Sequence, residues 1–142
     1  MNAKTIMAGI AAAIATFLVG YLIYGVLLMD YERSHSYHCT GLLKTPIVLW
    51  AIGVANIFWG VLLAYIFSMA GINTAGRGFI TGFIVVALFH AGVESLNYAT
   101  MYLHGKEIMV LNVFADGIIG GIGGLVIALI YGRSAVERPM TS

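Results

Sequence analysis

Residues 79–105 read FITGFIVVALFHAGVESLNYATMYLHG, an apolar segment long enough to cross a bilayer that nevertheless contains His90, Glu94 and Asn97. At about 100° per residue, these three side chains and His104 fall on one face of a continuous helix. A carboxylate at membrane depth costs ~2.5–3.5 kcal/mol on insertion scales, so Glu94 must face protein, water or a ligand rather than lipid. The rest of the chain has to supply what Glu94 faces.

The composition excludes an ordinary soluble domain. Of the 142 residues, 61% are hydrophobic and 9% are charged, whereas a soluble domain averages ~25% charged residues. The net charge of +1 comes with no basic patch and gives no reason to expect a nucleic-acid partner. Cys39 is the only cysteine, so no disulfide can form within the chain. We therefore expect a single membrane domain, residues 1–142, in contact with membrane lipid.

Four apolar runs each have the length of one membrane crossing. They are residues 7–29, 47–70, 79–103 and 108–131. The first run is longer than the apolar core of a signal peptide, ~7–15 residues, so we expect a retained helix. The predicted fold class is all-α: an integral membrane protein with four transmembrane helices in an up-down-up-down bundle. The longest polar connection is predicted at 30–46.

The charge distribution predicts an orientation. Of the seven Lys and Arg residues, four lie on the side of the two termini and three on the side of the 30–46 loop. By the positive-inside rule this bias places both termini in the cytoplasm. We expect a multi-pass protein of the bacterial cytoplasmic (inner) membrane.

Polar residues of the four predicted helices share one depth. Counted from the side of the 30–46 loop, Tyr21, Asn56, Glu94 and Asp116 each lie eight or nine residues inside their helix, ~12–14 Å below that face. We expect them to form one layer.

Two acids at one depth repel each other, and three arrangements would satisfy them. Glu94 and Asp116 could share one proton. His90, one turn from Glu94, could be protonated and pair with it. A metal or an organic cation could occupy the site, and oxygen and imidazole donors suit several divalent metals.

The last predicted helix carries a polar pair and two faces of small residues. Asn112 and Asp116 lie one turn apart on it. Small residues four apart let helices approach closely. The first such face consists of Gly120 and Gly124, and the second of Gly117 and Gly121. Because one face suffices within a subunit, we expect a homo-oligomer, a dimer or a trimer, packed partly through glycines.

Other polar residues have a plain structural interpretation. Asn56, Asn97 and Asn112 could bond helices together, as polar residues in membrane bundles often do. Tyr21 and Trp59 could pack between helices or anchor the chain at the interface.

The 30–46 loop contains a possible metal patch. His35, His38 and Cys39 lie close together in it, and His104 returns to the same side of the membrane. Their spacing matches no strong zinc pattern, and loop histidines are commonly just solvated. Cys39 could instead bridge two subunits.

Four motifs taken together resemble a known family. They are FLVGYLIYGVLL at 17–28, AGRGFITG at 75–82, HGKE at 104–107 and NVFADGIIGGIGG at 112–124. In this order they resemble a family of small bacterial four-helix integral membrane proteins catalogued only as a domain of unknown function. The resemblance spans most of the chain and implies the four-helix fold, and it implies no activity.

Three classes of function fit these residues. The first is a small membrane protein that binds or transports a proton, a cation or a cationic or amphipathic ligand through Glu94, His90, Asp116, Asn56 and Tyr21. The second is a membrane enzyme in which Glu94 or Asp116 acts as general acid or base with His90. The third is a structural or accessory subunit in which the polar layer only fixes assembly. No residue pattern identifies a cofactor.

Overall fold

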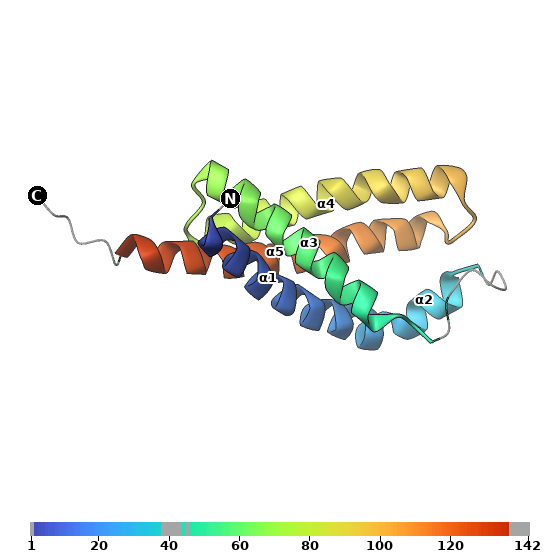
Figure 1. The fold of residues 1–142 in the computed structure, drawn as a ribbon. Coiled ribbons are helices and arrows are strands. Elements are labelled where there is room, and N and C mark those ends of the chain that lie inside the picture. The colour runs from blue at the N-terminus through green and yellow to red at the C-terminus, as the bar shows by residue number, and fades with distance from the viewer. Residues whose placement is uncertain (1, 38–43, 45, 137–142) are drawn as a thin grey trace, which may run out of the picture.

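The computed structural model describes residues 2–37, 44 and 46–136, without the side chains of 134–136, and is entirely helical apart from turns (Figure 1). The helices are α1 (Ala3–Leu22), the π-helical turn η1 (Ile23–Leu27), α2 (Met29–His35), α3 (Leu49–Ala70), α4 (Ala75–Thr100) and α5 (Lys106–Val136).

Four segments are long and apolar enough to cross a membrane, by length and composition. They are Ala3–Leu27, Leu49–Ala70, Ala75–Thr100 and Lys106–Arg133. The prediction of an all-helical chain with four such segments is confirmed, and such a set is typical of a multi-pass membrane protein.

Two boundaries differ from the prediction. Helix α4 ends at Thr100, three residues early, because Met101 adopts an extended conformation (φ −136°, ψ 149°). His104 therefore belongs to a turn and does not continue the helical face of Glu94. Residues 30–35, expected to be part of the 30–46 loop, belong to α2, which has Asp30 and Glu32 in its first turn and Arg33 and His35 in its last. This charge order suits the helix dipole.

The first segment changes its helical winding near its end. In η1 the Leu28 amide donates to the Ile23 carbonyl at 2.7 Å, a bond across five residues instead of four. Such wide turns are rare in proteins overall, and those that occur often lie at functional sites. The turn contains Tyr24, which points to α5.

The long helices pack as two pairs, α4 with α5 and α1 with α3, and α1 connects the pairs by packing on α5 as well. Helices α4 and α5 lie side by side as a hairpin, and α1 packs along both α3 and α5 (Figure 1). Buried apolar residues gather where α1, α3 and α5 meet. This cluster consists of Ala8, Ala12, Leu63, Ala64, Phe67, Ile72, Ile127 and Ala128. It belongs to the start of α1 and the ends of α3 and α5, whereas the polar cluster described below lies toward their opposite ends.

Glycines bring the backbones of α4 and α5 into contact. A Cβ atom at Gly82 would collide with the Gly120 carbonyl oxygen, and one at Gly124 would collide with the Gly78 carbonyl oxygen. Only the absence of side chains permits this approach.

The second glycine face of α5 is also used within the chain. Cβ atoms at Gly117 and Gly121 would lie 2.9 Å from Phe83 and 2.8 Å from Phe79, both on α4. The interpretation that one face remains for a second subunit is therefore wrong, because aromatic rings of α4 fill it. The homo-oligomer itself stays a prediction.

We expect Gly82→Ala to lower the free energy of unfolding by about 1–3 kcal/mol, because the two backbones must separate. Gly92→Ala on the same helix is the control, since a Cβ there meets nothing within 4 Å, and it should be neutral or gain up to about 1 kcal/mol of helix propensity. Denaturant titration in detergent micelles measures both variants. Equal stability of the two would contradict the close approach.

Candidate functional site

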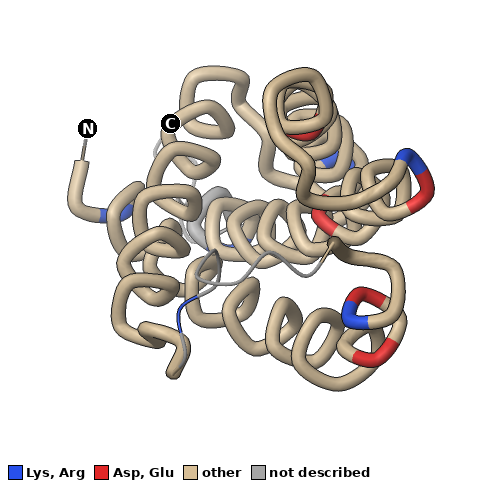
Figure 2. The backbone as a smooth tube through the Cα atoms, turned by 90° about the vertical axis from the view of Figure 1, so that its right-hand side faces the viewer, with Lys and Arg blue, Asp and Glu red and all other residues tan. Residues whose placement is uncertain are grey.

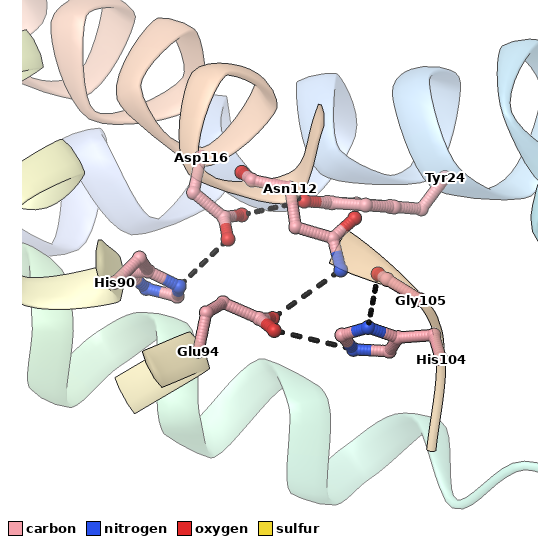
Figure 3. Close-up of polar contacts among 7 residues, drawn as sticks. All are labelled: Tyr24, His90, Glu94, His104, Gly105, Asn112 and Asp116. Atoms are coloured by element: carbon pink, nitrogen blue, oxygen red, sulfur yellow. Dashed lines mark hydrogen bonds and ion pairs between the residues drawn. The ribbon is translucent and has the colours of Figure 1, made fainter. Parts of the chain in front are cut away.

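A polar cluster joins α4, α5, the end of the first segment and the turn before α5 (Figure 3). Its first half centres on Asp116. The Nδ1 atom of His90 lies 2.6 Å from Oδ2 of Asp116, and the Tyr24 hydroxyl donates to Oδ1 at 2.9 Å. Both carboxylate oxygens are thus engaged, one by each partner.

The second half centres on Glu94, which is 8% exposed. The Asn112 amide nitrogen donates to Oε1 of Glu94 at 3.3 Å, and Nε2 of His104 lies 3.2 Å from Oε2. The His104 ring is oriented further by its Nδ1 atom, 3.4 Å from the Gly105 carbonyl oxygen. His104 thus reaches Glu94 from the turn and not from the same helix.

Asn112 links the two halves. Its backbone carbonyl oxygen accepts a hydrogen bond from the Tyr24 hydroxyl at 3.5 Å, and its side-chain amide donates to Oε1 of Glu94. Two buried acceptors, Oδ1 of Asn112 and Oε2 of Glu94, have no hydrogen bond from any described residue. His104 lies within ion-pair distance of that Glu94 oxygen but outside hydrogen-bond geometry. The cluster therefore lacks a donor for each of these two buried oxygens among the described residues.

The pairs follow from the register of the hairpin. Gly78 lies against Ala128, Gly82 against Gly124 and Val86 against Gly120. Continued by one turn at a time, the same register sets His90 against Asp116 and Glu94 against Asn112. The polar residues are the extension of the glycine contact, four residues apart on each helix.

The first loop holds the turn that carries His104. Ser36 and His104 form an antiparallel bridge, and the Tyr37 amide donates to the Leu103 carbonyl at 2.9 Å. Seen along the molecule, the charged residues lie mainly on α2, α4 and α5, and α3 has none (Figure 2). The cluster lies toward the end of the bundle that holds α2 and the start of α5, with Asp30, Glu32, Arg33, Lys106 and Glu107. We call this end of the bundle the charged end.

Glu32 of α2 is a third acid at this end. Burial raises the pKa of its carboxyl above the ordinary value, nearby His104 lowers that pKa, and the charges of Asp116 and Glu94 raise it further. The net direction is upward. Glu32 thus interacts electrostatically with both halves of the cluster.

The structure brings together four residues singled out in the sequence: Glu94, His90, Asp116 and Asn112. Of the three arrangements considered for the two acids, the pairing of His90 with Glu94 is not the one observed, because His90 pairs with Asp116 and Glu94 with His104. His104 joins this cluster instead of a metal patch.

Four other residues singled out in the sequence form no hydrogen bond or ion pair with the described members of the cluster. Tyr21 is 64% exposed, and Asn56 accepts a hydrogen bond from Thr16 of α1 at 2.9 Å. Among the described residues the Asn97 side chain has no hydrogen-bond partner. Trp59 lies beside the cluster, its ring centroid 6.1 Å from that of His90.

The predicted metal patch gains no support. His38 and Cys39 lie outside the described residues. The Nδ1 atom of His35 lies 2.9 Å from the Ser34 hydroxyl and 3.0 Å from the Tyr31 carbonyl oxygen. Within the described ranges no three His, Cys, Asp or Glu side chains are placed to hold a metal ion.

Sequence reasoning missed Tyr24 and Glu32. Counting depth along a regular helix favoured Tyr21, whereas Tyr24, three residues later, lies in the wide turn of η1 and reaches Asp116. The sequence pattern places Glu32 in the polar 30–46 connection. Its position three residues before His35 in a helix-compatible stretch was the available signal.

The chain was compared with family models, with curated proteins and with solved structures, and none of the three comparisons gives a match. The resemblance to a four-helix family stays a prediction, and the class that the geometry supports is that of a multi-pass helical protein with a buried histidine–carboxyl cluster.

We expect Tyr24→Phe to lower the free energy of unfolding by about 0.5–1.5 kcal/mol, the net value of a hydrogen bond, or more if Asp116 is left unsatisfied. Tyr21→Phe is the matched control on the same segment and should change stability by less than about 0.5 kcal/mol. Thermal unfolding in micelles compares the two variants. A larger effect at Tyr21 would contradict the placement of Tyr24.

Glu32 predicts a pH dependence with a definite sign. Because its pKa is higher in the folded protein than the ordinary 4.5, the folded state holds the proton longer, and stability is lost as the pH rises through the window above 4.5. Glu32→Gln should match the wild type in acid and lose less stability across that window. The measurement is the unfolding temperature of each protein as a function of pH. The exposed Glu107→Gln variant controls for the loss of one negative charge. If the pKa of Glu32 were not raised, the unfolding temperatures of the wild type and Glu32→Gln would change with pH at the same slope.

Proposed function

We propose that this protein is a membrane protein that binds protons at its charged end and transfers them toward the middle of the bilayer. The observation that carries the proposal is the pair of linked contacts His104–Glu94 and His90–Asp116, joined through Asn112 and Tyr24. Chains of Asp, Glu and His inside membranes are typical of proton relays.

The depths of the two pairs support a path. Glu94 lies six residues before the end of α4 at Thr100, and His90 lies ten before it. At ~1.5 Å per residue these positions are ~9 Å and ~15 Å inside, and ~15 Å is half of a typical hydrocarbon core. A proton entering beside Glu32 and His104 would thus reach mid-depth by passing between the titratable groups of the cluster, which Asn112 and Tyr24 hold in place.

The path stops at mid-depth in one chain. Beyond His90 and Asp116, α4 and α5 touch through Gly82, Gly120 and Gly124. Tight backbone contact leaves no polar group to continue the relay. The proposal is therefore a proton-loading site open toward one face and not a pore.

A proton fits this cluster better than a metal cation does. Both oxygens of Asp116 are engaged by His90 and Tyr24. The buried oxygen of Glu94 that lacks a hydrogen bond faces an imidazole, which would repel a cation when protonated. A single proton shared by Glu94 and His104 would satisfy that oxygen once the His104 ring turns into hydrogen-bond geometry.

The membrane setting is part of the proposal. We propose that the four apolar segments insert as an up-down-up-down bundle in the inner membrane of a bacterium, with both termini in the cytoplasm. The length and apolar composition of the segments support insertion. A homo-oligomer stays a prediction that mass measurement in lipid nanodiscs would test.

Infrared difference spectra recorded after a pH step in proteoliposomes test proton binding. We expect carboxyl and imidazole bands that respond to the step, with a carboxyl contribution missing in Glu94→Gln and another in Asp116→Asn. Glu107→Gln, on the exposed start of α5, is the control and should leave those two contributions in place.

Spectra without such contributions would contradict proton binding. The accessory-subunit interpretation would then take over, with the cluster bonding α4 to α5 as Thr16 and Asn56 bond α1 to α3.

A further inference from the structure

His90 has a second ring nitrogen that the cluster does not use. Its Nδ1 atom is engaged by Asp116, and its Nε2 atom has no hydrogen bond to any described residue. The side chain is 29% exposed. A polar atom at mid-depth that reaches the protein surface without a partner is costly unless a ligand satisfies it.

Two aromatic rings flank this histidine at the surface. The ring centroids of Trp59 and Phe89 lie 6.1 Å and 5.7 Å from that of His90, and 4.6 Å from each other in an edge contact. Trp59 is 43% exposed and Phe89 is 47% exposed. We name these three residues the aromatic trio.

The trio lies at the level of the bilayer midplane. Trp59 is ten residues from the start of α3 at Leu49, and His90 is ten from the end of α4 at Thr100. Both positions are ~15 Å deep. The Trp59 indole N–H, a second donor, has no hydrogen bond within the described residues either. Acyl chains at this depth offer no acceptor to these two donors.

We propose that the aromatic trio binds a lipid-soluble planar carbonyl compound of the quinone type, taken from the bilayer between α3 and α4. The ring of such a compound packs on Trp59 and Phe89, and its carbonyl oxygen accepts a hydrogen bond from Nε2 of protonated His90. When His90 is neutral with its proton on Nδ1, Nε2 accepts instead, which suits the hydroxyl of the quinol form. The inference deepens the proposed function by naming the ligand class at the inner end of the path.

Other ligands fit the trio less well. An organic cation would find no free carboxylate, because both Asp116 oxygens are engaged. The ester carbonyls of lipids lie at the headgroup level, ~15 Å away at the edge of the hydrocarbon core. A planar carbonyl compound that dissolves in the core meets both the donors and the aromatic faces.

The test uses the full-length protein in lipid nanodiscs and a short-chain alkylated benzoquinone as the probe. The chain has two tryptophans, so a Trp50→Phe background leaves Trp59 as the only indole. Quinone quenching of its fluorescence should be saturable. In this background Phe89→Leu should weaken binding by about 3- to 10-fold, the value of an aromatic contact.

Phe58→Leu is the matched control, because Phe58 neighbours Trp59 on α3 and is 71% exposed. It should leave the affinity within about twofold. His90→Leu should weaken binding by more than about tenfold, because it removes the only hydrogen-bonding group that the ligand shares with the cluster.

Quenching that rises linearly with the quinone in the lipid, or that changes equally in Phe58→Leu and Phe89→Leu, would overturn the inference. Infrared spectra keep this outcome separate from the proposed function. Carboxyl bands without saturable quinone binding refute the ligand and leave the proton site. Saturable binding without those bands refutes proton transfer and leaves the ligand site.

Discussion

The contact between the backbones of α4 and α5 determines where every group of the candidate site lies. Gly78, Gly82, Gly120 and Gly124 allow an approach that any side chain would prevent, and so they fix one register between the helices. In that register His90 faces Asp116 and Glu94 faces Asn112. A slip by one residue would rotate each polar side chain by about 100° away from its partner. The glycine contact in one half of the hairpin thus determines which polar side chains meet in the other half.

The cluster is held from outside the hairpin as well. Tyr24 reaches in from the wide turn of η1, and the bridge between Ser36 and His104 fixes the turn that carries the second histidine. Each buried carboxyl therefore has one partner on the opposite helix and one from another element. Such shared support would keep the members aligned during the proton transfer proposed above.

The features that could be predicted from the sequence are those that depend only on the spacing of residues within one helix. Four apolar runs, the face shared by His90 and Glu94, and the pair Asn112 and Asp116 all follow from spacing within one helix. Partners across helices were harder to find. The acid that pairs with His90 depends on the register of α4 against α5. The sequence does not fix this register, because either glycine face of α5 could form the contact with α4. The phenylalanines that occupy the second face, Phe79 and Phe83, read in the sequence as ordinary apolar residues. Tyr24 and His104 depend on a π-helical turn and on an early helix end, neither of which has a period to detect.

The short turn between α4 and α5 has a consequence for biosynthesis. Both pairs that join a histidine to an acid lie within a single hairpin, since His90, Glu94, His104 and Asp116 all belong to residues 75–136. A carboxyl entering lipid alone would meet the full insertion penalty of ~2.5–3.5 kcal/mol. Helices that leave the translocation machinery together, already paired, would present neutralised acids to the lipid. For the membrane insertion proposed above, the hairpin would therefore be the unit of insertion, and each of its two polar helices would depend on the other.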